Sequence, residues 1–487
     1  MSVTAAVDGK LFGRLFISGA WRDTAARLDV VNPATEDTIG SVGAAGERDI
    51  DDAVAAARVA LAGPWGLLSA RERGRFITKI SQRILERADE FARLETLHNG
   101  KPIFESRHIE FPAAAECFEY YAGWADKIHG ETIPVKGRFL TYTLREPVGV
   151  VAAIVPWNFP LLLTAWKVAP ALACGNTVII KPATQTPLTA LALAEVALEV
   201  GLPPGVINVV TGRGSDIGEY LVAHPGIDKI AFTGDTLTGR TVMRNAAGRL
   251  KHITLELGGK SPNIVFADAD LDAAVRGATT GIFYGKGEVC AAGSRLLVES
   301  RIKDEFIGRV VERARKMRPG DPMDPKTRLG SLVSRAQFDR VLRYVEVGRS
   351  EGATLLAGGK RFDIGTGKGF FVEPTVFADV TPVMTIAQEE IFGPVLAVIE
   401  FADVDDAIGK ANDCQYGLAA GLWTRDVKKA HNVAARLQAG TVWVNTYNVY
   451  DTAAPFGGYK QSGFGREMGM HALDHYTQTK TVWVDLT

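Results

Sequence analysis

The chain has 487 residues, of which 46% are hydrophobic and 23% are charged, and its formal net charge is −1. These proportions are typical of a globular protein, and the length exceeds what one hydrophobic core usually holds, so we expect two or three domains. The near-zero charge argues against a nucleic-acid partner, which a basic surface would attract.

The cysteines and the apolar stretches indicate in which cellular compartment to expect the protein. The four cysteines, at positions 117, 174, 290 and 414, lack the spacing of a zinc site or a disulfide framework, so we expect a reducing cytoplasm and no metal. Residues 1–16, MSVTAAVDGKLFGRLF, lack the order of a signal peptide. The stretch VGVVAAIVPW from residue 148 is too short to span a bilayer and predicts a buried strand, so no membrane partner is expected.

Helices and apolar strands alternate along the first half of the chain. Helical spacing over 51–61 and 71–98 is followed, from residue 148, by strands that are apolar throughout and separated by helices. Such strands are typical of a doubly wound parallel sheet, which binds ligands at the carboxyl ends of its strands. The predicted strands are 148–155, 176–181, 205–210 and 227–232, and the helices between them include 161–175 and 188–201.

A second α/β region follows the first. It contains predicted helices around 271–285 and 301–317 and predicted strands at 294–299 and 394–401. Two further segments, 138–147 and 476–486, alternate like exposed strands outside both regions. Such strands need a partner, and another subunit is one that would fit.

Two glycine patterns could hold a phosphate group. GRGSDIG (212–218) misses the dinucleotide-binding spacing by one residue and predicts a turn followed by a helix. FTGDTLTG (232–239) predicts a strand end and a helix start, and free N–H groups at a helix start attract phosphate. Asp235 could equally be an ordinary N-cap that repels phosphate, so this pattern leaves both interpretations open.

The stretch GEVCAAGSR (287–295) contains a cysteine among small residues. Cysteine often packs as a small hydrophobic residue, and taken alone the stretch favours packing over a nucleophilic role for Cys290.

Seven separate stretches occur in an order that changes this interpretation. They are PWNFP (156–160), KPATQTP (181–187), FTGDTLTG (232–239), LELGGKSPNIV (255–265), GEVCAAGSR (287–295), EEIFGPV (389–395) and PFGGYKQSGFGRE (455–467). Together they resemble the aldehyde dehydrogenase superfamily, from VNPATE (31–36) to the last strand. YYAGWADKIHGETIP (120–134) is also similar to the mammalian class 1 and 2 enzymes.

The resemblance implies an α/β fold with a Rossmann-type cofactor domain, an α/β catalytic domain and a small β oligomerisation arm. The expected boundaries are 1–126 with 147–257 for the NAD(P)-binding domain, 258–472 for the catalytic domain, and 127–146 with 473–487 for the arm. The assembly implied is a homodimer or a homotetramer built as a dimer of dimers.

The resemblance also implies how the chemistry proceeds. Cys290 attacks the aldehyde to form a thiohemiacetal and later a thioester, while Asn158 and the Cys290 backbone N–H hold the oxyanion. Glu256 is the general base that hydrolyses the thioester, and Lys167 and Glu467 carry the proton away. Plain structural roles stand beside these: a turn for Asn158, a salt bridge for Glu256, and an ion pair for Lys167 and Glu467.

Two other functions remain as alternatives. A structural or binding relative without activity would have lost Cys290, Glu256 or Asn158, and all three are present. A dehydrogenase that transfers the acyl group to coenzyme A would lack the base, so Glu256 favours hydrolysis to a free acid.

The implied cofactor is NAD or NADP. Lys181 would bind the adenine ribose, and Glu390 and Phe392 the nicotinamide ribose. Thr184 stands where NAD-specific members commonly carry a glutamate, so we expect NADP to be accepted, because a hydroxyl does not repel a 2′-phosphate. Asp235 replaces a usual serine and puts the pyrophosphate contact in doubt. The full set of expected cofactor residues is Pro156, Trp157, Lys181, Thr184, Gly234, Asp235, Gly239, Leu257, Glu390 and Phe392.

The positions that match the family's substrate tunnel are apolar or aromatic. They carry no basic residue, so we expect a medium-chain, aromatic or otherwise bulky hydrophobic aldehyde rather than one with an anionic tail. Ordinary core packing is the alternative interpretation. The positions are Ala113, Phe159, Leu162, Leu163, Trp166, Val289, Ala291, Tyr450 and Phe456.

Overall fold

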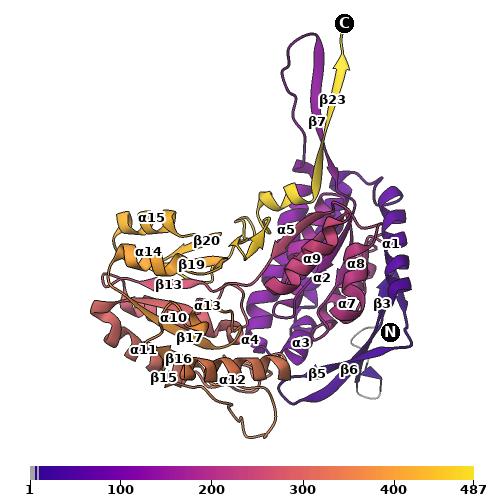
Figure 1. Ribbon diagram of the computed structural model, residues 1–487. Helices are drawn as coiled ribbons and strands as arrows, with labels where there is room; N and C mark the ends of the chain where they lie inside the picture. The colour runs from indigo at the N-terminus through magenta and orange to yellow at the C-terminus, as the bar shows by residue number, and fades with distance from the viewer. Residues whose placement is uncertain (1–5, 8–9) are drawn as a thin grey trace.

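Figure 1 shows a computed structural model of the chain, which describes residues 6–7 and 10–487. The expectation that residues 1–16 form no signal peptide, and the start of the segment 1–126, therefore lie partly outside the described residues. Two large sheets with their helices form the body, and a two-stranded ribbon projects from it (Figure 1). Within the described residues, no helix combines the length and the apolar character needed to cross a bilayer.

The first large sheet has eight strands in the order β22-β12-β11-β8-β9-β10-β3-β4. Its five central strands are parallel: β8, β9, β10 and β11 lie in the apolar stretches that predict this, β12 (HITLE) was not among the predicted strands, and short antiparallel strands close both edges. The doubly wound prediction is therefore confirmed. The strands are β3 (Leu15–Ile17), β4 (Ala20–Arg22), β8 (Val150–Ile154), β9 (Thr177–Lys181), β10 (Ile207–Val209), β11 (Lys229–Thr233), β12 (His252–Glu256) and β22 (Gly463–Phe464).

Helices cover both faces of this sheet (Figure 1). Helix α2 begins at a capping box between Ser69 and Glu72 and turns its isoleucines inward and its charged residues outward. Helices α6 and α7 are buried nearly all round because they lie between the sheet and the outer helices α2, α3 and α5. The helices are α1 (Glu47–Ala62), α2 (Ala70–Glu86), α3 (Ala88–Asn99), α5 (Phe111–Trp124), α6 (Pro160–Ala173), α7 (Leu188–Glu199), α8 (Glu219–Ala223) and α9 (Thr236–Ala247).

The second large sheet has seven strands in the order β15-β16-β17-β14-β13-β19-β20, and all but β15 run parallel. The strands are β13 (Pro262–Val265), β14 (Arg295–Glu299), β15 (Thr354–Ala357), β16 (Thr375–Ala378), β17 (Val395–Phe401), β19 (Ala419–Trp423) and β20 (Thr441–Val444). Its helices are α10 (Leu271–Phe283), α11 (Lys303–Lys316), α12 (Arg335–Ser350), α13 (Thr385–Gln388), α14 (Val404–Asn412) and α15 (Val427–Arg436). The loop from α10 to β14 carries Cys290.

The two alternating segments pair with each other. Strand β7 (Phe139–Pro147) and strand β23 (Thr477–Asp485) are antiparallel along their full length and form the projecting ribbon of Figure 1. Along this shared edge, each strand therefore pairs within the chain rather than with another subunit. The ribbon still exposes large apolar side chains, among them Phe139, Leu144 and Trp483.

A four-stranded sheet near the N-terminus was not predicted, because its strands are short or strongly mixed in polarity. Its order is β1-β2-β6-β5. The strands are β1 (Ala6–Val7), β2 (Lys10–Gly13), β5 (Arg27–Asn32) and β6 (Asp37–Gly43).

Candidate active site

A cavity of about 390 Å³ lies at the carboxyl edge of the eight-stranded sheet. Its walls are formed by the segments that follow β8, β9, β11 and β12, together with Cys290 and residues from α12 and the 390–392 segment. Parallel strands end at one edge of a sheet, and ligands of doubly wound proteins bind there. The cavity therefore lies where the strand pattern predicts a ligand.

Cys290 lines this cavity and is half-buried, whereas Cys117, Cys174 and Cys414 are buried. Burial raises the pKa of the Cys290 thiol to about 12, and the charges of Glu390 and Glu256 add to the rise. The thiol is therefore protonated in this arrangement. The sequence left open what ionises it, and these surroundings oppose ionisation.

Asn158 lines the same cavity, just after β8. Its Nδ2 donates to the backbone oxygen of Glu288 at 3.0 Å, which joins the Asn158 segment to the Cys290 loop. An amide nitrogen carries two hydrogens, so the second can be donated to an oxyanion. The structure thus brings the two residues expected to act on the aldehyde carbonyl to one cavity.

Glu256 is the last residue of β12 and is 3% exposed. Neither carboxyl oxygen has a hydrogen-bond partner among the described residues. Burial raises its pKa well above the usual range, and the nearby charge of Glu467 raises it further. Gly457 leaves room beside it, since a Cβ there would lie 2.8 Å from Glu256 Oε1. A carboxyl group held this way is a stronger base than one in water once it ionises.

Lys167 and Glu467 form a fully buried ion pair at 2.5 Å. Lys167 Nζ also donates to Thr233 Oγ1 at 2.5 Å, at the end of β11. The ion pair that the sequence allowed is therefore present, and it stands close enough to Glu256 for both charges to act on that carboxyl group.

The segments expected to hold the adenosine part of a cofactor meet at one side of the cavity. Lys181 ends β9 with a buried side chain, and among the described residues its Nζ hydrogen-bonds to the Pro182 carbonyl alone, at 3.4 Å. Burial lowers the pKa of this lysine to about 8. A buried ammonium so weakly paired is suited to an anionic or hydroxyl-rich ligand. Thr184 Oγ1 donates to the Gly212 carbonyl at 3.4 Å.

Asp235 is the N-cap of α9. Its carboxylate accepts from Thr238 N at 2.9 Å and from Thr238 Oγ1 at 2.6 Å. The sequence left open whether Asp235 is an N-cap, and the structure shows that it is. Its carboxylate lies at the start of α9, among the residues that line the cavity. Gly239 packs against Leu257, where a Cβ would meet the leucine side chain at 2.5 Å.

Glu390 and Phe392 line the same cavity. Glu390 Oε1 accepts from Gly259 N at 3.0 Å, and burial raises the pKa of its carboxyl group to about 7. The ring of Phe392 stands edge-on to Trp157, with centroids 5.1 Å apart. Pro156 and Trp157 also line the cavity. A cofactor that bridges the two sheets fits this arrangement of residues.

Most residues expected for the substrate form an apolar group behind Cys290. Trp166 lies 5.6 Å from Phe456 and 6.3 Å from Tyr450, measured between ring centroids. Phe159 stacks on Tyr284, at the start of the Cys290 loop, with centroids 6.3 Å apart. Leu162, Leu163 and Val289 pack in the same core, whereas Ala291 is fully buried and Ala113 is partly exposed on α5. The described lining of the large cavity includes none of these residues.

Several residues of the site were not predicted. Gln337 and Arg340 reach the cavity from α12, whose sequence has the ordinary pattern of an exposed amphipathic helix. Gly214, from the GRGSDIG turn, also lines it, and the turn continues as the predicted helix start. No local pattern distinguishes the α12 residues, because the contact is made between distant parts of the chain.

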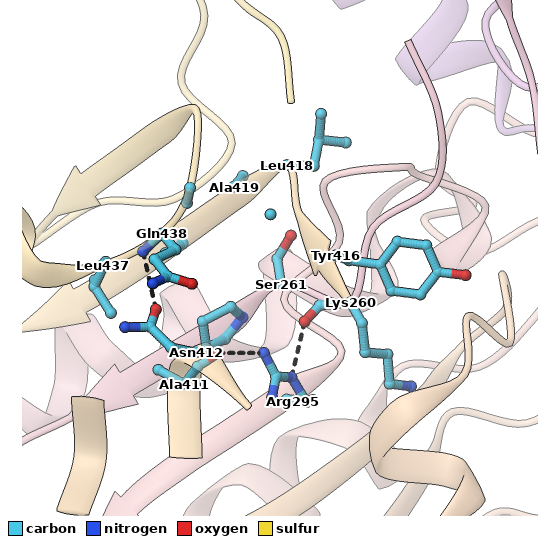
Figure 2. A pocket seen from close by; sticks show the side chains of 14 residues that line it. Lys260, Ser261, Arg295, Ala411, Asn412, Tyr416, Leu418, Ala419, Leu437 and Gln438 are labelled. Atoms are coloured by element: carbon cyan, nitrogen blue, oxygen red, sulfur yellow. Dashed lines mark hydrogen bonds between the residues drawn. The ribbon is translucent and has the colours of Figure 1, made fainter. Parts of the chain in front are cut away.

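A second, much smaller cavity of about 10 Å³ lies beside Arg295 in the seven-stranded sheet (Figure 2). The Arg295 guanidinium donates to the backbone oxygens of Lys260, Lys410 and Ala411, so its hydrogen-bonding groups are satisfied. A space of this size holds at most one water molecule, and we assign it no ligand.

Comparisons with known proteins place these features in one family. The model of the "Aldehyde dehydrogenase family" matches residues 21–482. Human retinal dehydrogenase 2 is 48% identical over 98% of this chain and 92% of its own length. The NAD⁺ complex of the aldehyde dehydrogenase from Bacillus cereus superposes with a TM-score of 0.96 at 49% identity, covering 97% and 96% of the two chains. The indole-3-acetaldehyde dehydrogenase of P. syringae, in a complex with NAD⁺, gives a TM-score of 0.95 at 45% identity over 97% of each chain.

The raised pKa of Cys290 leads to a prediction for chemical labelling. Iodoacetamide should modify Cys290 before the three buried cysteines, and the rate should rise about tenfold per pH unit from about pH 7 to 10, since only the thiolate reacts. Glu256→Gln removes a charge that raises this pKa and should speed labelling, whereas Glu195→Gln, on α7, should not. Peptide mass spectrometry measures the rates, and a plateau below about pH 8 would contradict the assignment.

Proposed function

The chain belongs to the aldehyde dehydrogenase family, and we propose that it oxidises a hydrophobic aldehyde to the free carboxylic acid through intermediates bound to Cys290. The family's reaction is the NAD(P)-dependent oxidation of aldehydes. One observation carries the assignment of residues: the one half-buried thiol of the four lies in the same cavity as the Asn158 amide and within reach of the Glu256 charge.

In the first half of the proposed reaction, Cys290 Sγ adds to the aldehyde carbon. The thiol proton passes to water, a C–S bond forms, and the carbonyl oxygen becomes an oxyanion. Asn158 Nδ2 and the backbone N–H of Cys290 donate to this oxyanion, and one such donor typically contributes about 10²–10³ in rate. This step is needed because the planar carbon of an aldehyde is a poor hydride donor, whereas the tetrahedral adduct is a good one.

NAD or NADP supplies the hydride acceptor when it is bound. The residues proposed to hold it are Lys181 and Thr184 at the adenosine end and Glu390 and Phe392 at the nicotinamide end, with Pro156 and Trp157 between them. Asp235 is proposed to weaken binding, because its carboxylate stands at the helix start that a pyrophosphate would otherwise approach.

The second half removes the acyl group from sulfur. We propose that Glu256 takes a proton from water as the water attacks the thioester, the C–S bond breaks, and the carboxylic acid leaves. The support for this role is the buried, unpartnered carboxyl group with a raised pKa. Glu467 and Lys167 are proposed to receive the proton next, since their charges already act on Glu256.

We also propose which segments of the chain form each functional domain. Residues 1–126 and 147–257 form the cofactor-binding domain, residues 258–472 the catalytic domain, and residues 127–146 and 473–487 the arm. The support is the distribution of strands among the two large sheets and the ribbon. The apolar side chains that the ribbon exposes support a homodimer or a dimer of dimers, and the four free thiols support a cytoplasmic location.

For the substrate, we propose a medium-chain, aromatic or otherwise bulky aldehyde. The aromatic group of Trp166, Tyr450 and Phe456 supports this, because it offers apolar surface and no cation for an acidic tail. The names of two relatives, a retinal dehydrogenase and an indole-3-acetaldehyde dehydrogenase, agree with a bulky apolar substrate.

Two substitutions test the chemistry. Cys290→Ala should abolish NAD(P)H formation, while Cys414→Ala should leave it intact. Glu256→Gln should slow steady-state turnover by about 10²–10⁴ and leave an initial burst near one equivalent of NAD(P)H, because the acyl-enzyme then accumulates. Stopped-flow absorbance at the NAD(P)H band measures both phases. Normal turnover of Glu256→Gln would refute the base assignment.

Thr184 leads to a prediction about cofactor choice. The kcat/KM values of the unaltered enzyme for NAD and NADP should lie within about tenfold of each other, and Thr184→Glu should lower the NADP value by about 100-fold through charge repulsion. Gln185→Glu adds the same charge one residue away and serves as the control. A hundredfold preference of the unaltered enzyme for NAD would overturn the proposal.

A panel of aldehydes tests the substrate proposal. Hexanal and benzaldehyde should give higher kcat/KM values than acetaldehyde, because each buried methylene contributes about 0.8 kcal/mol. Trp166→Ala should lower the kcat/KM values for hexanal and benzaldehyde more than it lowers the value for acetaldehyde. A clear preference of the unaltered enzyme for acetaldehyde would exclude the wide apolar tunnel.

A further inference from the structure

The loop that precedes Cys290 has an unusual backbone. Gly285, Lys286 and Gly287 have φ angles of +56°, +64° and +72°, all in the left-handed region. Glycine adopts this region freely, but a lysine does so only when its surroundings hold it there. The lysine side chain, which is 2% exposed, makes the contacts that do so.

Lys286 joins two separate parts of the chain. Its Nζ donates to Asn99 Oδ1 at 2.7 Å and to Asn99 O at 2.9 Å, at the end of α3. The same nitrogen forms an ion pair with Glu288 Oε2 at 2.7 Å. All three residues are buried, so these contacts are shielded from water.

The contacts continue into the catalytic residues and close a ring. Asn99 Nδ2 donates to the Trp157 carbonyl at 2.7 Å, and Asn158 Nδ2 donates to the Glu288 carbonyl at 3.0 Å. The Asn158 segment and the Cys290 loop are thus joined twice, once directly and once through Asn99 and Lys286. Glu288 Oε1 also accepts from Val333 N at 3.0 Å, which anchors the ring to the catalytic body.

We propose that Asn99, Lys286 and Glu288 are positioning residues that hold the Asn158 amide and Cys290 in register before the aldehyde arrives. The proposal rests on the proposed function, because it assigns the ring to the oxyanion step. A buried ion pair is weak evidence for stability, since desolvation offsets the attraction, so a structural purpose alone does not account for this one. An oxyanion donor, by contrast, acts only when its geometry is set in advance.

The test uses a reaction that needs no cofactor. Hydrolysis of p-nitrophenyl acetate at a thiol passes through a tetrahedral oxyanion, so it reports on Cys290 and Asn158 directly. Lys286→Met should lower kcat for the ester and for aldehyde oxidation by about 10- to 100-fold, with KM changed by less than about threefold. In an Asn158→Ala background, the same substitution should have no further effect on kcat, because the donor it positions is absent.

Matched variants separate positioning from folding. Arg87→Met removes another ion-paired cation, at the start of α3 and about 18 Å from Asn99 at the 1.5 Å rise per residue of that helix, and should lower the melting temperature without lowering kcat. Glu288→Gln leaves one oxygen for two donors, Val333 N and Lys286 Nζ, and should lower kcat less than Glu288→Leu, which should repeat the Lys286→Met loss. If Lys286→Met does not fold, Glu288→Leu takes its place, and its effect on kcat is compared with and without Asn158→Ala.

The outcomes distinguish two kinds of failure. Multiplicative effects of Lys286→Met and Asn158→Ala on kcat would overturn the positioning role, because the two residues would then act independently. Ester hydrolysis that survives Cys290→Ala would instead refute the proposed function. Loss of activity on Cys290→Ala together with non-additive effects supports both.

Discussion

The removal of ionisable groups from water at one sheet edge is the constraint on which the site depends. Glu256, Cys290 and Glu390 all have pKa values above their usual range, and burial is the first cause for each. Burial thus disfavours the ionised form of all three groups, and in the proposed reaction Cys290 and Glu256 act in their ionised forms. The fold keeps these groups largely out of water, and Lys167 at Glu256 and Gly259 N at Glu390 offset only part of the effect of burial.

The doubly wound sheet provides that exclusion. Its central strands are mostly apolar between their ends, apart from Asn208 in β10 and Thr254 in β12, and helices α6 and α7 cover them closely. Asn158, Lys181, Thr233 and Glu256 all lie at or just beyond such ends. The loop that leads into the second sheet contributes Cys290 to the cavity at this edge, so the proposed chemistry draws on both sheets.

The sequence predicted the fold well and the site unevenly, for physical reasons. Apolar strands without alternation indicate a parallel sheet, and the pattern at 148–232 held in the structure. Cys290 could not be assigned from its own neighbours, because a buried thiol and a nucleophile share the same local sequence. Distant motifs supplied the assignment. Gln337, Arg340 and the partners of Glu288 could not be predicted, since their contacts join segments far apart in the chain and leave no local periodicity.

Because Cys290 is the one half-buried thiol, its protonation state affects how readily oxidants modify the protein. In the proposed mechanism, peroxide and an aldehyde compete for the same sulfur, and oxidation beyond the sulfenic acid is irreversible for most proteins. The reactive species is the thiolate, so a pKa near 12 keeps resting Cys290 in the form that oxidants attack slowly. The desolvation of Cys290 therefore has two effects. The thiol has to be ionised before it can act in the proposed reaction, and until then it reacts slowly with oxidants.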